Sequence, residues 1–453
     1  MAIFLVDFNV TLGYVKVSMR RSPRNVRIAF SHGGLTHYGG VLFFHEFTRV
    51  LQLRRFLTRH LHYPRRNQRY LLSQMILALL YPAILGLDRL ETAALLRSNG
   101  TFQYLTGLQS YPNPQSLRRF LLQAPAEFRD QLHRLNDHLV QQFIHRPAHR
   151  SRVILDLDST VVTVFGRQEG AAVGYNPRYR GKRSYDPLLC VEANSSFLWD
   201  AALRPGDAGT WAGSVDLLAR CFESLPLDIR EVRVRADAGF GYRPVLDALE
   251  ARPAHYAVVA RMTPVLKRAL GGLRYHRLNA RWEIAEFQHR PSDWPRPRRC
   301  VVARRPIEET DPEPTLFTLE RYLYRAWLTN LPLTPAGVWH FYDGRAGMEP
   351  RIRELREDFA LRKIPTRAFA ANALYLEIIR LAYNLVTAFQ RMCLPEEWQD
   401  VTLSTLRHRL FWLPGELIRP HNRPTLRLAN SPIIQARAET ILHRVRNLTP
   451  LED

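Results

Sequence analysis

The stretch SRVILDLDSTVV, from Ser151 to Val162, combines the pattern of a buried strand with two acidic residues. Its apolar residues are typical of a strand that is covered on both faces: Val153, Ile154, Leu155, Val161 and Val162. Asp156 and Asp158 share one face, where a carboxylate is costly unless it is paired or binds a metal. Asp158 lies nearer the end of the strand and is predicted to reach solvent or a metal. Asp156 is expected to hydrogen-bond inside the fold or to support Asp158.

Composition indicates a globular protein with a polyanionic partner. The chain has 453 residues, enough for two or three domains, of which 46% are hydrophobic and 23% charged. Lys and Arg exceed Asp and Glu by 64 − 42 = +22. Residues 1–150 hold 20 cationic and 7 acidic residues, a local excess of +13. This asymmetry favours nucleic acid as the partner, and the alternative is a basic protein that adheres nonspecifically, for example to ribosomes.

We predict a cytoplasmic, nucleoid-associated protein; the cysteines and the apolar segments indicate that it is intracellular and has no membrane span. The four cysteines lie far apart with no zinc-binding spacing, as expected of reduced thiols. The start, MAIFLVDFNV, lacks the basic region of a signal peptide. The most apolar segment, LLSQMILALLYPAILGL (Leu71 to Leu87), predicts a buried helix broken at Pro82.

The N-terminal region, residues 1–150, is predicted to be mainly helical and to bind DNA. Apolar residues recur at helical spacing in FFHEFTRVLQLRRFL and in PAEFRDQLHRLNDHLVQQFI. Between them, YPNPQSLRRFL predicts a turn followed by a helix, and this helix carries Arg118 and Arg119 in its first turns. A helix-turn-helix that brings these arginines to DNA is one interpretation, and a solvated basic face is the other.

The rest of the chain predicts an α/β fold with a mixed sheet flanked by helices. Residues 151–262 alternate between strands and helices, and residues 263–333 form a β-rich insertion. Residues 334–395 complete the α/β domain with helices. Residues 396–453 are predicted to form a hairpin and a final helix that serve DNA binding or dimerisation.

The second candidate acid, Asp237, closes the alternating strand pattern of EVRVRADAGF (Glu231 to Phe240). The Ala238–Gly239 turn follows it. An acid at the end of a sheet strand, just before a turn, is where open α/β folds carry functional groups. The alternative role for Asp237 is to cap the helix that follows.

The third candidate acid, Glu349, lies in YDGRAGMEPRIRELREDF (Tyr342 to Phe359). If this segment is helical throughout, Tyr342, Arg345, Glu349 and Arg356 fall on one stripe. Two glycines and Pro350 weaken the assumption of one continuous helix. The alternative is a solvated charged face with pairs four residues apart.

Two acids on strands and one on a helix are the ligands that a two-metal site for phosphoryl transfer needs. Mg²⁺ prefers carboxylate oxygens, and two such ions activate the attacking oxygen and stabilise the leaving one. Without metal, three converging acids would repel one another and their pKa values would rise.

Four stretches together resemble the DDE transposases of bacterial insertion sequences, over about residues 45 to 430. They are LDLDST, GRQEGAAVGYNPRYRGKRSYDPLL, RADAGF and YDGRAGMEPRIRELRED. The last is similar to the signature Y-x2-R-x3-E-x6-K of a cut-and-paste branch with a β-rich insertion. Here Arg356 replaces the lysine, and Pro350 directly follows the glutamate. The resemblance implies an RNase H-like catalytic domain.

The resemblance also implies a site and a reaction. Asp158, Asp237 and Glu349 would bind two Mg²⁺ ions, with Mn²⁺ as a substitute, and would cleave the ends of the element and transfer the freed strand. Tyr342, Arg345 and Arg356 would hold phosphates. The partners would be the terminal inverted repeats, the target double-stranded DNA and a second copy of the chain in a synaptic homodimer.

Two further features could contact DNA. The loop GYNPRYRGKRSYDP, which contains Lys182 and Arg183, is predicted to follow the phosphate backbone, or else is an ordered connection with exposed cations. By the resemblance, the insertion can supply an aromatic residue that stacks on a flipped base, with these candidates: Trp282, Trp294 and Trp327.

Two other functions remain open at this stage. One is an RNase H-like DNA nuclease without strand transfer. The other is a catalytically silent, transposase-derived DNA-binding protein, which the presence of all three acids disfavours.

Overall fold

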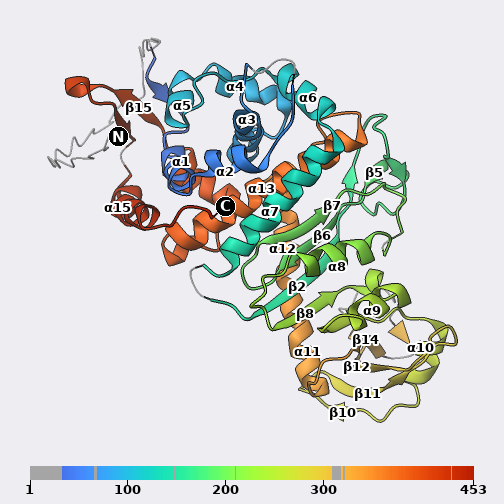
Figure 1. Cartoon of the computed structure of the whole chain (residues 1–453). Helices are drawn as coiled ribbons and strands as arrows, with labels where there is room; N and C mark the ends of the chain where they lie inside the picture. The colour runs from blue at the N-terminus through green and yellow to red at the C-terminus, as the bar shows by residue number, and fades with distance from the viewer. Residues whose placement is uncertain are drawn as a thin grey trace, which may run out of the picture.

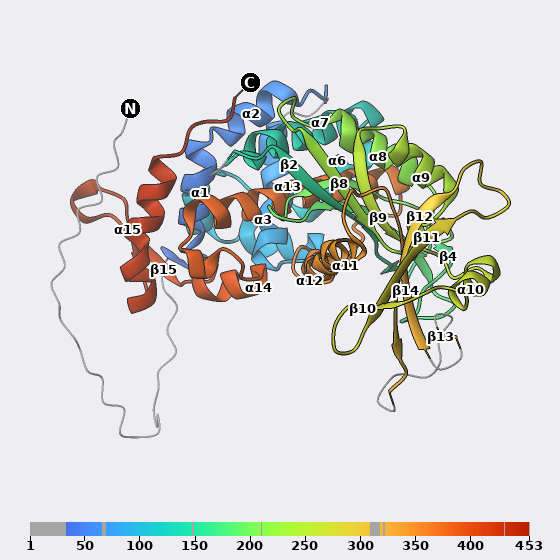
Figure 2. The same ribbon diagram turned by 90° about the horizontal axis from the view of Figure 1, so that it is seen from below.

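The computed structural model describes residues 33–65, 69–146, 149–209, 211–308, 318–319, 322–429 and 431–452. The first 32 residues, and with them part of the predicted DNA-binding region, lie outside the described residues. Figures 1 and 2 show a helical part, built from both ends of the described chain, beside a long twisted sheet.

The central sheet confirms the predicted α/β fold with a mixed sheet. It has ten strands in the order β10-β11-β12-β14-β9-β8-β2-β6-β7, with β13 paired to β14. Strands β2, β8 and β9 are parallel to one another. On the other side of β2, β6 pairs antiparallel with β2, and β7 pairs antiparallel with β6. This arrangement of β7-β6-β2-β8-β9 is that of an RNase H-like core. The strand bounds are β2 Arg152–Ser159, β6 Leu188–Glu192, β7 Leu198–Ala202, β8 Glu231–Ala236 and β9 Ala254–Val259.

The β-rich segment extends this sheet. Its last long strand pairs with β9, with Trp327 opposite Val259, so the segment is continuous with the catalytic core. The strands are β10 His276–Arg277, β11 Glu283–His289, β12 Arg298–Pro306, β13 Thr318–Leu319 and β14 Tyr322–Thr329. Two smaller sheets are formed by β3 Val162–Thr163, β4 Ala172–Val173 and β5 Arg183–Tyr185, and by β1 Leu35–Thr36, β15 Gly415–Ile418 and β16 Thr425–Leu428.

Helices cover the sheet and form the N-terminal and C-terminal parts. Before the sheet come α1 Val41–Val50, α2 Leu53–His60, α3 Leu72–Leu85, η1 Leu90–Ala93, α4 Ala94–Arg97, α5 Gly100–Leu105, α6 Pro114–Gln123 and α7 Ala126–Ile144. Within it are α8 Ser214–Glu223, η2 Ala238–Phe240, α9 Arg243–Glu250 and α10 Pro264–Leu270. After it come α11 Pro335–Asp343, η3 Gly344–Gly347, α12 Met348–Glu357, α13 Phe369–Cys393, η4 Glu396–Trp398, α14 Leu403–Leu406, η5 Arg407–Phe411, η6 Pro420–Asn422 and α15 Pro432–Arg446.

The two ends of the described part of the chain pack together. β1 pairs with β15, α15 contacts α1, and the Leu451 N–H donates to the Leu51 carbonyl at 3.1 Å. The hairpin and final helix predicted for residues 396–453 are present as β15, β16 and α15. The predicted domain boundaries remain predictions.

The prediction that Pro82 breaks its helix is wrong. α3 continues past Pro82 to Leu85 and is almost entirely buried. A proline removes the N–H that would bond to the carbonyl four residues earlier, here Ala78. The hydroxyl of Tyr111 donates to that carbonyl at 2.5 Å, so the carbonyl is satisfied without the helix bond. No described helix is both long and apolar enough to cross a membrane.

The edge strand β7 is covered by polar side chains of the long buried helix α13. The Asn384 amide accepts from the Leu198 N–H at 2.8 Å and donates to the Leu198 carbonyl at 3.0 Å. Arg380, which is fully buried, pairs with Asp137 at 2.6 Å and with Glu377 at 3.5 Å. Burial opposes the charge of Glu377, but its hydrogen bond with His133 and its other partners lower its pKa to about 2.

We expect Arg380→Met to destabilise the protein by about 3–5 kcal/mol, because the substitution leaves buried carboxylates without their cation. The matched control is Arg49→Met, which removes an arginine whose side chain is 60% exposed and pairs with Glu46. This control should cost less than about 1 kcal/mol. Urea unfolding of both variants measures the difference, and equal losses would contradict the assigned role of Arg380.

Candidate active site

Asp158 and Asp237 lie side by side at the ends of neighbouring parallel strands. The register of β2 and β8 places Leu157 opposite Ala236, so the two acids are the next residues in line. Burial raises the pKa of Asp158 to about 6, Arg345 opposes the rise, and the charge of Asp237 adds to it. The predicted meeting of the first two acids is therefore present in the structure.

Backbone groups fix both carboxylates. The Ser159 N–H donates to Oδ1 of Asp158 at 2.8 Å, and the Gly239 N–H donates to Oδ1 of Asp237 at 2.9 Å. Asp237 thereby caps the short turn η2. The capping alternative considered for Asp237 is thus realised on η2, and it does not prevent the same carboxylate from lining the cavity described below.

The segment that carries Glu349 is helical but changes its helix type. The 3₁₀ turn η3 separates α11 from α12, so the predicted single stripe is interrupted. Arg345 Nη2 donates to Asp158 Oδ2 at 2.8 Å and to the Leu157 carbonyl at 2.9 Å. Tyr342 packs against Trp327, with ring centroids 5.7 Å apart. Burial raises the pKa of Tyr342 to about 12, the charge of Arg345 opposes this rise, and those of Asp237 and Asp158 add to it.

A cavity of about 1360 Å³ brings the three candidate acids together. Asp158 and Asp237 line it from the sheet, and Glu349, in the first turn of α12, lines it from the helical side. Arg356, in the last turn of α12, also lines the cavity, and its buried Nε has no hydrogen-bond partner among the described residues. Further cationic residues surround these acids: Arg89, Arg118, Arg178, Arg353, Arg362 and Lys363.

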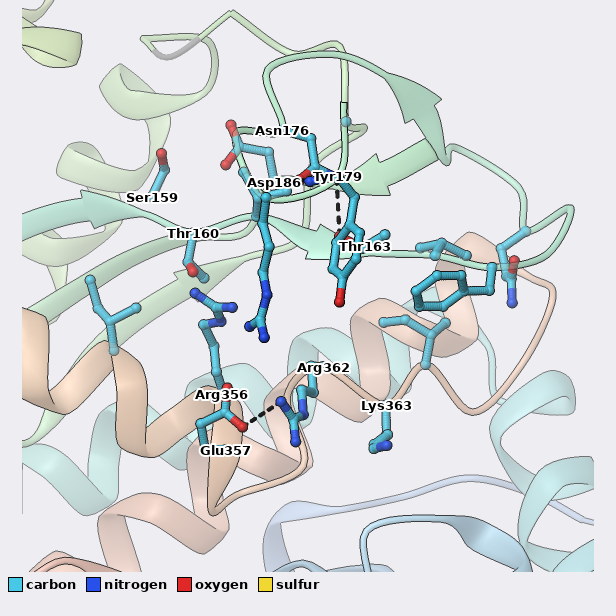
Figure 3. A pocket seen from close by; sticks show the side chains of 18 of the residues that line it. Ser159, Thr160, Thr163, Asn176, Tyr179, Asp186, Arg356, Glu357, Arg362 and Lys363 are labelled. Atoms are coloured by element: carbon cyan, nitrogen blue, oxygen red, sulfur yellow. Dashed lines mark hydrogen bonds and ion pairs between the residues drawn. The ribbon is translucent and has the colours of Figure 1, made fainter. Parts of the chain in front are cut away.

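Figure 3 shows Arg356, Arg362 and Lys363 on the helical side of this cavity, across from Ser159, Thr160 and Asp186. Some of these cations are already paired: Arg362 with Glu357, and Lys363 with Asp88 at 3.4 Å. The cavity therefore combines clustered acids on the sheet with cations around them, a distribution that suits metal ions and a phosphate chain.

Asp186 is a cavity acid that sequence analysis missed. It lies just before β6, and Arg204 Nη2 holds its Oδ2 at 2.7 Å. Burial raises the pKa of Asp186, and Arg204 opposes that rise. The signal in the sequence that could have identified Asp186 is its position. It precedes a proline at the end of the cation-rich loop, and that loop follows the strand of Asp158. Its arginine partner is 18 residues away and gives no local pattern.

Asp156 joins the strands of the first two acids to the helix that precedes the third. Arg235 in β8 donates to both carboxylate oxygens of Asp156, at 2.6 and 2.7 Å, and to the Phe341 carbonyl in α11 at 2.8 Å. A Cβ on Gly344 would lie 2.6 Å from Arg235 Nη1, so any side chain at this position would displace the guanidinium. Burial raises the pKa of Asp156, and Arg235 opposes the rise.

The other predicted DNA contacts lie in different surroundings. Arg118 lines the cavity and pairs with Glu91, whereas Arg119 is exposed on α6 and does not line it. Lys182 and Arg183 are exposed at β5 and likewise do not line the cavity.

The insertion tryptophans are packed. Trp294 and Trp327 are buried, with 7% and 2% exposure, and Trp282 lies against Trp339, with ring centroids 4.8 Å apart. Core packing is the role that the structure supports for each of them.

The three acids offer ligands of the kind that divalent metal ions bind. Their carboxylate oxygens are the hard donors that Mg²⁺ prefers. In the described part of the chain, one set of three potential ligand atoms lies within 4.8 Å of one another, and it is formed by His145, His149 and Asp228. The three acids of the cavity are therefore farther apart than that. A carboxylate shared by two ions allows the outer ligands to lie farther apart.

Comparisons with known proteins indicate which family this chain resembles. A family model described as "Transposase DDE domain group 1" matches residues 19–450, nearly the whole chain. No curated protein matches. One similar solved structure is a cryo-EM structure of a piggyBac transposase synaptic complex with hairpin DNA, at 11% identity and a TM-score of 0.45. The match covers 84% of this chain and 82% of that one.

We expect Asp156→Ala to destabilise the protein by about 3–5 kcal/mol, because Arg235, whose side chain is 5% exposed, would keep a buried charge without a partner. The matched control is Arg152→Met. Arg152 pairs with Glu231 across the same two strands, but its side chain is 53% exposed, so the loss should stay below about 1 kcal/mol. Urea unfolding measures both changes, and an Asp156→Ala variant as stable as Arg152→Met would refute the role of the buried pair.

Proposed function

This chain belongs to the DDE transposase family, and we propose that it cuts the ends of an insertion sequence and joins them to target DNA. The observation that supports this most directly is the cavity itself, which is lined by Asp158, Asp237 and Glu349 and surrounded by cations. The family uses divalent metal ions, and the proposed ones are two Mg²⁺ ions, with Mn²⁺ as a substitute.

The three acids would hold the ions in this proposal. The bound ions would supply an activated water or 3′-hydroxyl and stabilise the departing oxygen of the phosphodiester. Arg345 now balances the charge of Asp158 through its 2.8 Å contact. When that carboxylate binds another cation, the guanidinium becomes available to a DNA phosphate. Arg356, whose Nε has no partner in the described residues, is suited to the same task.

The proposed substrate is double-stranded DNA, first the terminal inverted repeats and then the target. The net charge of +22 and the cations around the cavity support a polyanion. We propose phosphate contacts at Arg345 and Arg356, backbone contacts at Lys182 and Arg183, and end binding by the helix of Arg118 and Arg119. Tyr342, which packs on Trp327, is proposed to hold a phosphate together with these arginines. The chain is proposed to act as a homodimer that brings two ends together.

We expect Asp158→Asn, Asp237→Asn and Glu349→Gln each to lower cleavage to about a thousandth or less of the wild-type rate, as loss of a single essential catalytic group does in other enzymes. Binding to DNA ends should persist, because the cations remain. The matched control is Glu357→Gln, which changes an exposed acid of the same cavity that pairs with Arg362.

The assay incubates purified protein and Mg²⁺ with DNA that carries the repeats flanking its own gene, and maps broken and joined strands. Joined products distinguish a transposase from a nuclease that only cuts. Full cleavage by Glu349→Gln would show that another residue is the third ligand.

We also expect DNA affinity to fall steeply with salt, because each neutralised phosphate releases counterions. Arg356→Gln should reduce the slope of log K against log salt by about one. Arg437→Gln, on the distant helix α15 where Arg437 pairs with Glu397, should leave the slope unchanged. Fluorescence anisotropy over a salt series measures both, and equal slopes for wild type and Arg356→Gln would remove Arg356 from the DNA contacts.

A further inference from the structure

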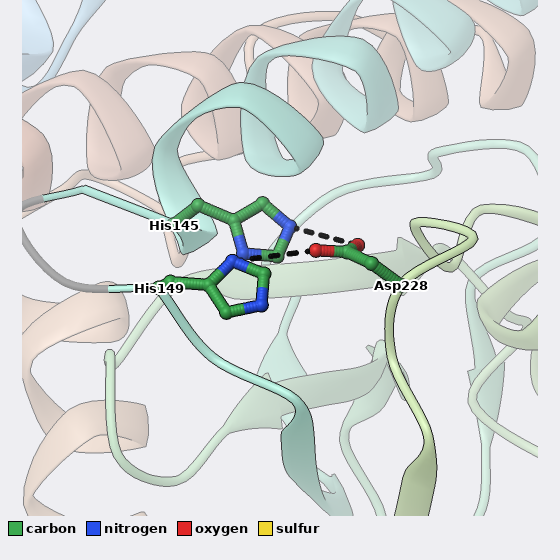
Figure 4. Close-up of side chains that lie close together, drawn as sticks. All are labelled: His145, His149 and Asp228. Carbon is green, nitrogen blue, oxygen red and sulfur yellow. Dashed lines mark ion pairs between the residues drawn. The ribbon is translucent and has the colours of Figure 1, made fainter.

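His145, His149 and Asp228 form a compact group where α7 meets the central sheet (Figure 4). His145 directly follows α7, His149 lies three residues before β2, and Asp228 lies three residues before β8. The nitrogen and oxygen atoms that they offer as ligands all lie within 4.8 Å of one another. None of these residues takes part in the proposed reaction.

Each histidine lies close enough to the Asp228 carboxylate for both to be ligands of one zinc ion. His145 Nε2 lies 3.2 Å from Asp228 Oδ1, and His149 Nδ1 lies 3.4 Å from Asp228 Oδ2. Ligands that each lie about 2.0–2.2 Å from a tetrahedral zinc ion are about 3.4 Å apart. The two imidazole rings are stacked, with centroids 4.9 Å apart and planes inclined by 13°, so one exposed ring, that of His149, turns when both nitrogens bind the same ion.

The ring of His145 has a nitrogen that an ion could use. Its Nε2 is buried and forms no hydrogen bond with any residue that the structure describes, although it faces Asp228. Binding through Nε2 would place the ring proton on Nδ1. The long 3.4 Å contact from the Arg150 N–H to Nδ1 would then be lost, at little cost for so weak a bond.

We propose that His145, His149 and Asp228 bind one Zn²⁺ ion, at a site separate from the acid cavity. Imidazole ligands favour Zn²⁺, whereas Mg²⁺ favours oxygen ligands, so the two sites select different metals. A water molecule or the second carboxylate oxygen completes the coordination. Asp158 follows His149 by nine residues of mostly extended chain, which places the zinc roughly 25–30 Å from the cavity.

At this position the ion would have a structural role. It would tie the end of α7 to the segments that lead into β2 and β8, where the Arg230 N–H already donates to the Ser151 carbonyl at 2.8 Å. Those two strands carry Asp158 and Asp237 at their opposite ends. The zinc would therefore hold the helical part against the strands that position the first two acids.

The test measures zinc in full-length protein loaded with Zn²⁺ in excess Mg²⁺ and then dialysed against metal-free buffer. We expect about one zinc per chain for wild type and for the control His62→Ala, which changes an exposed histidine outside the group. His149→Ala and Asp228→Asn should retain none. Added Zn²⁺ should raise the Tm of wild type and His62→Ala but not of the two site variants, because binding stabilises the folded state.

Asp158→Asn separates this site from the acid cavity and should retain the zinc. Loss of zinc from Asp158→Asn would place the ion in the cavity and overturn the proposal. Equal zinc in wild type and His149→Ala would also overturn it, and would leave the group as a histidine–aspartate ion pair only. Because His149 and Asp228 are exposed, both variants are expected to fold, and circular dichroism checks this.

Discussion

The buried ion pair between Asp156 and Arg235 is the contact on which the arrangement of the acids depends. It joins β2 to β8 through two hydrogen bonds, and Arg235 also holds the Phe341 carbonyl of α11. Each of these three elements leads within a few residues to one of Asp158, Asp237 and Glu349. Removal of either charge would leave the other buried without a partner, which costs far more than the loss of a surface pair. The two acids in this buried strand are therefore tolerated for different reasons. Asp156 is paired with Arg235, and Asp158 lines the cavity.

Asp158, Asp186 and Asp237 are each stabilised by a partner of their own, although the protein as a whole is strongly basic. Arg345 pairs with Asp158, and Arg204 pairs with Asp186. Asp237 accepts the Gly239 N–H. Burial still raises the pKa values of Asp158 and Asp186, so these contacts only partly offset the loss of solvation. A site with this residual cost gains from divalent cations, which supply more positive charge than one guanidinium does.

Local patterns were sufficient to predict β2, β8 and the two acids at their ends, because alternation and turn residues are visible within ten residues. The partners could not be predicted, since Arg235 is 79 residues from Asp156 and Arg345 is 187 residues from Asp158. The single stripe predicted from Tyr342 to Arg356 is interrupted for a geometric reason. Each residue of a 3₁₀ turn advances by 120° and not 100°, so the four residues of η3 rotate the following helix by roughly 80°. The break predicted at Pro82 was wrong for another reason. The Tyr111 hydroxyl that donates to the Ala78 carbonyl lies 33 residues away along the chain, so no local pattern reveals it.

The extension of the sheet explains how Glu349 reaches the two strand acids. β14 runs antiparallel to β9, and β9 runs parallel to β8. β14 therefore finishes at the end of the strands that lies away from the cavity. The chain must then cross the length of the sheet again before an acid can face Asp158 and Asp237. The nine residues of α11 and the four of η3 rise roughly 22 Å, while the six residues of β8 span roughly 20 Å. The two helical segments together are thus about as long as β8, and the Phe341 carbonyl near the end of α11 accepts a hydrogen bond from Arg235 near the end of β8. The insertion sets the starting point of this return and α11 sets its length, so the two together determine where Glu349 enters the cavity.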